Sequence, residues 1–174
     1  MNSNSYFYDD NDNCRRNRND RKPQSTTTLK CSTPSTVTIP ILADPGSTFP
    51  TNSLSVRTPD NSTCCTRLDF TSNIVVPVGF IGTLSFQIFK QCRNQLTPVP
   101  VGPAFTFART VALVVGSADT FSFFICDCDP GCDDDDCCTY SVVITNLSAI
   151  TLGATVSNAT LSAITTCNER CCKC

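Results

Sequence analysis

The sequence lacks histidine and tryptophan altogether, contains a single methionine, and has only 7 glycines among its 174 residues. Histidine is the side chain that titrates nearest neutrality, so acid–base catalysis would need a strongly shifted carboxylate, lysine or cysteine. A Gly-rich phosphate loop and a G-x-S-x-G nucleophile elbow are also missing from the sequence. We therefore expect no catalytic site, no cofactor and no enzymatic activity.

The sequence also lacks a large net charge and long apolar runs. The net charge is -2, whereas a protein that binds nucleic acid needs a basic face. No run approaches the roughly 18 apolar residues that a membrane-spanning helix requires. We expect neither a nucleic-acid partner nor a membrane span. Residues 1–10 contain no apolar h-region, so we also expect no signal peptide and synthesis in a cytoplasm.

Cysteine, by contrast, is abundant. The chain contains 14 cysteines, close to the level that marks a disulfide scaffold in short secreted chains. A cytoplasm keeps thiols reduced, so the high cysteine content conflicts with the missing signal peptide. Two explanations remain open: the thiols bind metal, or the protein reaches an oxidising environment by a route other than secretion.

The chain divides into three parts by composition. Residues 1–34 are dominated by Asn, Asp, Arg, Ser and Thr and have too little apolar surface to fold alone, which predicts a flexible N-terminal connector arm. If it were extended, this arm would span on the order of 100 Å. Residues 35–166 alternate between short apolar runs and breakers, and residues 167–174 form a cysteine-rich tail.

The central part reads as all-β. Leu84, Phe86 and Ile88 share one face of a strand while Ser85 and Gln87 share the other, and no stretch shows a helical period. The pattern predicts an eight-stranded antiparallel jelly-roll-like β-sandwich, with an immunoglobulin-like topology as the alternative. The expected strands are Thr36–Leu42, Ser53–Thr58, Thr66–Val76, Thr83–Cys92, Ala104–Val111, Asp119–Cys126, Cys138–Asn146 and Ala154–Thr165.

Residues 126–138 combine five cysteines with six aspartates. Zinc knuckles use paired C-x2-C spacings, which do not occur in this stretch, and a calcium loop would need glycine where Cys132 stands. We interpret the stretch as a solvated hairpin loop that disulfides hold in place, with no metal bound. The candidates for disulfides within the subunit are Cys126, Cys128, Cys132, Cys137 and Cys138.

The remaining cysteines predict links between chains. Adjacent cysteines in a strand point to opposite faces, so one can bridge inside the domain while the other faces outward. A two-sheet domain of this size is expected to fold without disulfides. Seven disulfides that each add roughly 2–4 kcal/mol to the free energy of unfolding would exceed what such a domain needs to be stable. Two or three of the cysteines, such as Cys92, are interpreted as small hydrophobic residues of the core. The intermolecular candidates are Cys14, Cys31, Cys64, Cys65, Cys167, Cys171, Cys172 and Cys174.

Five segments carry a resemblance to a known family: Leu68–Val75, Ser85–Cys92, Leu96–Pro103, Thr120–Cys128 and Asn158–Ile164. They resemble an uncharacterised cysteine-rich domain family of spore-forming clostridia. More distantly, the architecture is similar to that of bacterial endospore appendage (spore pilus) subunits. Those proteins are jelly rolls whose N-terminal connector cross-links to neighbouring subunits through cysteine.

The resemblance implies a location and a partner. A spore-surface protein is made in the mother-cell cytoplasm without a signal peptide, and it meets oxidising surroundings later. We therefore expect a structural subunit that self-assembles into a disulfide-cross-linked fibre or layer on the endospore surface, with a helical filament as the assembly. Its expected partners are copies of itself and other spore coat or exosporium proteins.

Two other functions are compatible with the sequence. A zinc-binding module would use the cysteines of residues 126–138 and 167–174, and elemental analysis would reveal its metal. A carbohydrate-binding sandwich ranks lower, because the chain has no Trp and only 3 Tyr to form an aromatic platform.

Overall fold

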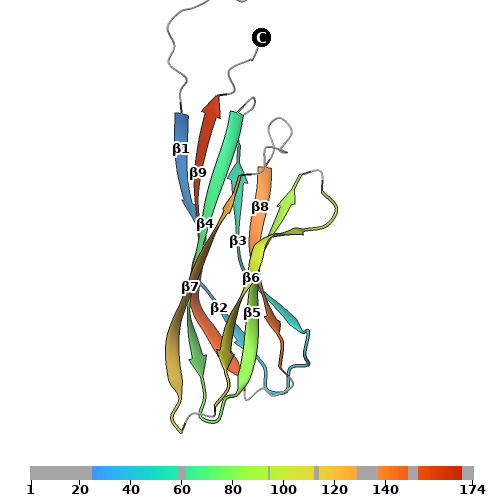
Figure 1. The fold of residues 1–174 in the computed structure, drawn as a ribbon, viewed down its shortest axis with the longest axis vertical. Helices are drawn as coiled ribbons and strands as arrows, with labels where there is room; N and C mark the ends of the chain where they lie inside the picture. Colours follow the sequence, from blue (N-terminus) through green and yellow to red (C-terminus); the bar gives the residue numbers. More distant parts are fainter. Residues whose placement is uncertain are drawn as a thin grey trace, which may run out of the picture.

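The computed structural model describes residues 25–58, 62–93, 95–111, 114–128, 137–148 and 153–169. These residues form nine strands and no helix (Figure 1). The strands are β1 (Ser25–Cys31), β2 (Ser35–Ile39), β3 (Thr48–Arg57), β4 (Ser62–Val76), β5 (Gly82–Cys92), β6 (Val99–Arg109), β7 (Ser117–Asp127), β8 (Cys137–Asn146) and β9 (Ala154–Glu169).

The strands pack as two antiparallel sheets. Sheet A has the order β1-β9-β4-β7, with β2 also pairing with β9, and sheet B has the order β3-β8-β5-β6. Strands β1 and β2 occupy successive lengths of the same edge of β9, so the sandwich has eight strand positions. With its crossing Greek-key connections, this order is that of a jelly roll. The predicted all-β antiparallel sandwich is confirmed.

Strand β1 lies in the segment that composition assigns to the arm. All seven of its residues are exposed, and its backbone pairs with β9 from Ser25↔Asn168 to Cys31↔Ser162. A strand that buries no side chain leaves no apolar pattern in the sequence, so the prediction missed it. Residues 25–34 therefore belong with the sandwich, and β9 likewise runs on to Glu169, into the expected tail.

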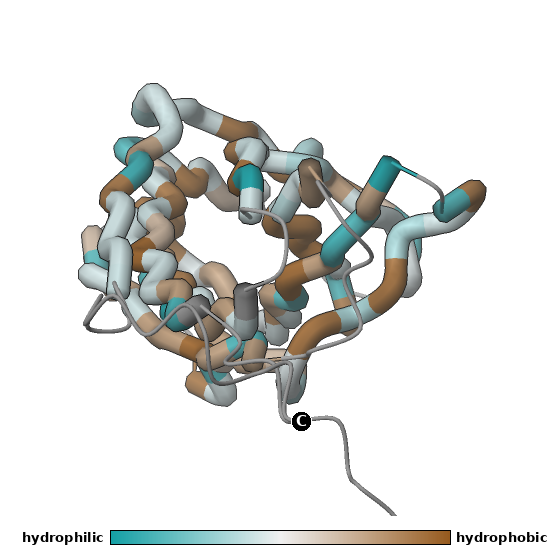
Figure 2. The backbone as a smooth tube through the Cα atoms, turned by 90° about the horizontal axis from the view of Figure 1, so that it is seen from above, coloured by the Kyte–Doolittle hydropathy of each residue, from teal (hydrophilic) through white to brown (hydrophobic). Residues whose placement is uncertain are grey.

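The core follows the period-2 pattern of the strands. In β5 and β8 alternate side chains are buried throughout, and hydrophobic and hydrophilic residues alternate along the chain when the sandwich is viewed from one end (Figure 2). Phe70 of sheet A meets Phe86 of sheet B with ring centroids 5.9 Å apart. Each fully buried aromatic ring contributes roughly 1.5–3 kcal/mol to stability, so this interior holds the two sheets together.

The two long sides of the sandwich differ. On the β1–β3 side, Lys30 Nζ donates to Ser55 O at 2.9 Å and Asn52 Nδ2 donates to Thr33 O at 2.8 Å. On the β6–β7 side, an ion pair between Arg109 and Asp119 spans the sheets. The rings of Phe105, Phe107 and Phe121 are only partly buried on this second side.

Candidate functional site

Three disulfides gather at one end of the sandwich. They join Cys64 to Cys167, Cys65 to Cys128, and Cys92 to Cys138. This is the end at which β4 and β8 begin and at which β5, β7 and β9 finish, and the first described residue, Ser25, lies there too (Figure 1). We call it the cysteine end.

Strand register explains the pairings. Cys64 lies directly opposite Cys167, and Cys92 directly opposite Cys138. The Cα atoms of these pairs are 4.1 Å and 4.0 Å apart, the close spacing of a non-hydrogen-bonded antiparallel pair. Cys65 reaches Cys128 by continuing the β4–β7 register one step beyond Thr66↔Asp127.

Three of the cysteines expected to link chains are instead bonded inside the subunit: Cys64, Cys65 and Cys167. The expectation was that one thiol of an adjacent pair bridges internally while the other faces outward. Strand β4, however, is central and has β9 on one side and β7 on the other. Cys64 and Cys65 do point to opposite faces, and each finds a partner on a different neighbouring strand.

The other sulfur atoms are distributed as follows. Cys128 and Cys138 are in disulfides within the subunit, whereas Cys126 and Cys137 carry free thiols. Cys92, interpreted as a small hydrophobe, is buried but disulfide-bonded. The remaining cysteines lie outside the described residues, so their predicted roles stay predictions: Cys14, Cys132, Cys171, Cys172 and Cys174.

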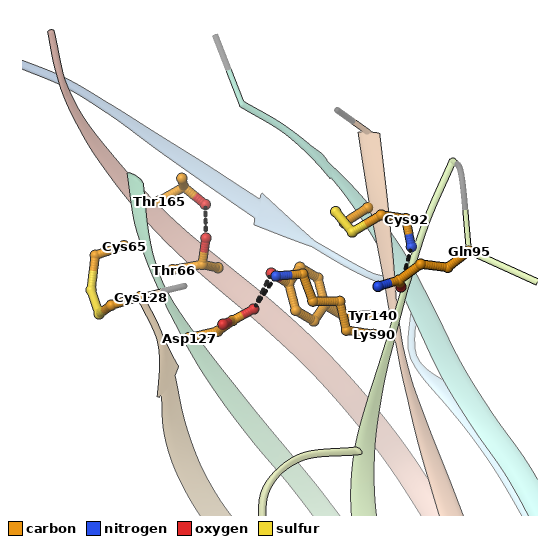
Figure 3. A network of polar contacts seen from close by, with 10 residues as sticks. Cys65, Thr66, Lys90, Cys92, Gln95, Asp127, Cys128, Tyr140 and Thr165 are labelled. Atoms are coloured by element: carbon orange, nitrogen blue, oxygen red, sulfur yellow. Dashed lines mark hydrogen bonds and ion pairs between the residues drawn. A yellow bond between two sulfur atoms is a disulfide. The ribbon is translucent and has the colours of Figure 1, made fainter. Parts of the chain in front are cut away.

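A buried polar network lies beneath the disulfides (Figure 3). Lys90 Nζ is 2.9 Å from Asp127 Oδ2, and the two side chains are only 9% and 10% exposed. The hydroxyl of Tyr140 donates to the same oxygen at 2.7 Å. Lys90 belongs to β5 of sheet B and Asp127 ends β7 of sheet A, so the network connects the two sheets.

Sequence reasoning did not single out this network, although one signal was present. Lys90 follows Phe86 and Ile88 at the spacing of two that defines the inward face of β5. A lysine at an inward position of a regular strand indicates a buried partner of opposite charge. The identity of that partner, Asp127, requires knowledge of which strand end faces β5.

Three free thiols occur among the described residues: Cys31, Cys126 and Cys137. Cys31 and Cys126 are exposed, and they lie on β1 and β7, the two opposite edges of sheet A. Both point to the outer face, away from sheet B, because their neighbours Leu161, Ala163 and Ile125 point into the core. Cys137 is partly buried on β8, opposite Arg57.

Cys126 has a cationic and aromatic neighbourhood. It lies directly opposite Arg67, whose Nη2 is 2.8 Å from Asp69 Oδ1 and whose Cζ is 4.6 Å from the centre of the Phe124 ring. The hydrogen bond to Asp69, followed by the charge of Asp69, raises the pKa of Arg67. Arg67 therefore places a charged guanidinium opposite Cys126 on the outer face of sheet A.

The far end of the sandwich is apolar. A cavity of about 840 Å³ opens there between the turns that follow β2 and β4 and precede β7 and β9. Ile41 and Val78 on its wall are more than half exposed. The molecule therefore has three disulfides at one end and an apolar hollow at the other.

Metal ligands do not converge in the part of the chain that the structure describes: no three Cys, Asp or Glu side chains there are placed to hold an ion. The run Asp133–Asp136 and the tail cysteines of the zinc alternative lie outside that part. Within the same described ranges, no helix is long and apolar enough to cross a membrane.

Several solved structures are similar to this chain at low sequence identity. A chain of the infectious bursal disease virus Gt strain is 12% identical, with a TM-score of 0.47, and the alignment covers 83% of this chain and 38% of the viral one. The virus's VP2 subviral particle is 9% identical with a TM-score of 0.43, and the alignment covers 85% and 38%. Latent PorU from Porphyromonas gingivalis is 10% identical with a TM-score of 0.35, and the alignment covers 83% and 13%.

This chain thus spans well under half the length of those proteins, and the likeness concerns only the fold. No curated protein matches the sequence. A family model described as a domain of unknown function (DUF4489) matches residues 25–166, which is nearly the whole of the described sandwich. The chain belongs to this family of uncharacterised domains.

Proposed function

We propose that the protein is a non-enzymatic structural subunit that self-assembles into a disulfide-cross-linked fibre or layer on the bacterial endospore surface. The observation that carries the proposal is the placement of the thiols. Three disulfides already brace the cysteine end, yet Cys31 and Cys126 remain free and exposed at the two edges of one sheet. Thiols in such positions stabilise nothing inside the subunit but are accessible to a neighbouring copy.

The N-terminal segment supplies a second means of connection. Residues 1–24 precede β1 at the cysteine end and carry Cys14 together with the basic residues Arg15, Arg16, Arg18, Arg21 and Lys22. An extended segment of this length reaches roughly 80 Å, well beyond the radius of gyration of about 15 Å expected for the domain. In this proposal the arm reaches an adjacent subunit and Cys14 bonds to it.

The contact geometry favours an open assembly. The apolar hollow at one end and the cysteine end at the other are different surfaces, so copies that associate in the same orientation meet through heterologous contacts. Heterologous contacts that do not close into a ring produce helical filaments. A helical homopolymer, with other spore coat or exosporium proteins as further partners, is the form we propose.

The location follows from the resemblance to domains of spore-forming clostridia. In this proposal the subunit is made in the mother-cell cytoplasm, where thiols are reduced. It becomes cross-linked once it reaches the outside of the spore. This sequence of events accounts for the 14 cysteines of a chain that is made where thiols are reduced.

Electron microscopy and gels of the purified full-length chain test the proposal. We expect filaments or sheets, and a ladder of multimers on a non-reducing gel that collapses when a thiol reductant is added. Cys14→Ser and deletion of residues 1–24 should each shorten the ladder. A protein that stays monomeric after oxidation would overturn the proposal, and near-stoichiometric zinc bound to reduced protein would favour the metal-binding alternative.

A further inference from the structure

The four edges of the two sheets differ in their protection. In sheet B the edge strand β3 contains Pro50 and the edge strand β6 contains Pro100 and Pro103. Proline has no backbone N–H and blocks the addition of another strand. In sheet A the edge strands β1, β2 and β7 contain no proline. Sheet A can therefore be extended at both edges, whereas sheet B is protected.

The direction of the strands allows one copy to continue the sheet of another. Every neighbouring pair in the order β1-β9-β4-β7 is antiparallel. Strands β1 and β7 consequently run in opposite directions. A second copy placed beside β7 in the same orientation presents its own β1 antiparallel to β7, so the alternation continues without a break.

The backbone groups at both edges also point outward at matching residues. Cys64 and Cys167 form a close pair with Cα atoms 4.1 Å apart, which marks them as non-hydrogen-bonded partners. Hydrogen-bonded and non-hydrogen-bonded pairs alternate along an antiparallel ladder. By this alternation, the pairs Arg67↔Cys126 and Cys31↔Ser162 are also non-hydrogen-bonded. The backbone N–H and C=O groups of Cys126 and Cys31 therefore point away from the sheet, toward its open edges.

An independent contact agrees with this assignment. Ser32, the residue after Cys31, donates its backbone N–H to Leu161 O of β9 at 2.8 Å. Successive residues of a strand direct these groups to opposite sides. The groups of Cys31 therefore face the open edge.

We propose that sheet A continues from one copy to the next by antiparallel pairing of β7 with the edge that β1 and β2 form in a second copy, joined by a disulfide between Cys126 and Cys31. This inference rests on the proposed self-assembly and names its lateral interface. Both thiols are free and lie on the outer face of the sheet, so directly opposed they share a face. A hydrogen-bonded pair has Cα atoms about 5.5 Å apart, within the range of disulfides.

The register sets the form of the assembly. Within one copy, Leu29, Ile164, Arg67 and Cys126 lie in one row across sheet A. A second copy at the same height would place its Leu29 opposite Cys126, and a shift of two residues, about 7 Å, brings its Cys31 there instead. An equal offset at every junction gives a helical rise, so the interface produces an open filament.

The chemistry of the link requires an oxidant. Two thiols lose two protons and two electrons as the sulfur–sulfur bond forms. An oxidised low-molecular-weight disulfide accepts the electrons and leaves as two thiols. One of the two cysteines attacks this small disulfide, and the thiol of the other copy then displaces the small thiol from the mixed disulfide.

Single-thiol mixing tests the link. The starting protein is the full chain that carries Cys14→Ser, Cys132→Ser, Cys137→Ser, Cys171→Ser, Cys172→Ser and Cys174→Ser, which keeps the three internal disulfides. From it we take a Cys31→Ser variant and a Cys126→Ser variant, and oxidise each with oxidised glutathione. Neither alone should give cross-linked species, whereas an equal mixture should give dimers and nothing larger, with the 31–126 linkage found by peptide mapping. A mixture that stays monomeric overturns the link.

Proline substitution tests the strand pairing without using sulfur. Ser122 lies four residues before Cys126 on β7, so its backbone N–H points in the same direction. Ser122→Pro therefore removes an N–H that faces the open edge. Phe123→Pro removes one that binds β4 and serves as the destabilising control. Ser122→Pro in the natural sequence should keep its melting temperature but lose its filaments. Filaments that persist in both Ser122→Pro and Cys126→Ser overturn this interface and leave self-assembly standing, whereas a natural protein that never assembles refutes the proposed function itself.

Discussion

Lys90 and Asp127 form an ion pair between the two sheets, with Nζ 2.9 Å from Oδ2 and both side chains at most 10% exposed. Tyr140 donates a hydrogen bond to the same carboxylate oxygen. Removing two charges from water is costly, so such a pair persists only when both partners are present and hydrogen-bonded. In the view of Figure 3 the pair is drawn between the Cys65–Cys128 disulfide and Cys92, and it connects the two sheets.

Replacing one partner of this pair should be far more harmful than replacing the whole network. Lys90→Met leaves the Asp127 carboxylate buried without its cation, and we expect the free energy of unfolding to fall by about 3–5 kcal/mol. The triple variant Lys90→Met, Asp127→Leu, Tyr140→Phe removes every polar group and should lose much less. Urea unfolding at pH 7, with the disulfides intact, measures both. Equal losses in the two variants would contradict a desolvated ion pair.

The core could be predicted from the sequence because it follows a local pattern. Leu84, Phe86 and Ile88 recur at every second residue, and all three are buried in β5. Strand β1 has no such pattern, since all its side chains are exposed and its backbone is paired to β9. A strand that is ordered mainly by backbone pairing to its neighbour cannot be recognised before the neighbour is known.

Removing either of two disulfides should cost a similar amount of stability, and far more than removing a free thiol. The Cys92–Cys138 bridge spans 46 residues and the Cys64–Cys167 bridge spans 103. When both cysteines of a bridge are changed to alanine, loop-closure entropy predicts that the free energy of unfolding falls. The expected fall is about 4 kcal/mol for Cys92–Cys138 and slightly more for Cys64–Cys167. Each loss corresponds to a drop in melting temperature of roughly 8–16 °C in a protein of this size.

Cys31→Ala provides the matched control for these pairs. Its thiol is exposed and free on an edge strand, and a surface change of this kind alters stability by less than about 0.5 kcal/mol. Calorimetry under non-reducing conditions gives all three melting temperatures. A pair variant that melts with the control would show that its bridge does not form.

The loss of stability at low pH should depend on the ion pair between Arg109 and Asp119 on the β6–β7 side of the sandwich. The hydrogen bond from Arg109, and then that from Ser117, lower the pKa of Asp119. A carboxyl whose pKa is lower in the folded state stabilises the fold above its unfolded pKa of about 3.9. That contribution is lost as the pH falls through the folded pKa, because the group then becomes protonated in both states.

Arg109→Gln makes this expectation measurable. A carboxyl-carbon NMR titration should show that the pKa of Asp119 rises toward its ordinary value in the variant. The difference in unfolding free energy between the natural protein and Arg109→Gln should be largest near pH 6 and should shrink below pH 3. On an Asp119→Asn background the same change should have no such pH dependence. A pH-independent difference in the natural background would rule out the proposed linkage.

The disulfide pattern lay beyond the sequence for a different reason from β1. The sequence showed that Cys64 and Cys65 must have different partners, but not that β4 is bordered by strands on both sides. Only the strand order β1-β9-β4-β7 places Cys167 and Cys128 on either side of them. The cysteines on the sheet edges, Cys31 and Cys126, are distinguished from the bridged ones by the same order.

Gly102 marks a place where the two sheets approach too closely for a side chain. It has a φ of +67°, and a Cβ atom built there would lie 3.1 Å from Ile125 Cγ2 of β7. Gly102→Ala therefore combines an unfavourable backbone conformation, which costs roughly 1–3 kcal/mol, with a steric clash on the inward face of sheet A. Gly46→Ala has a similar φ of +87° but open space around the new methyl group, so it isolates the backbone contribution. Urea unfolding should show a clearly larger loss for Gly102→Ala than for Gly46→Ala, and equal losses would mean that Ile125 moves aside without cost.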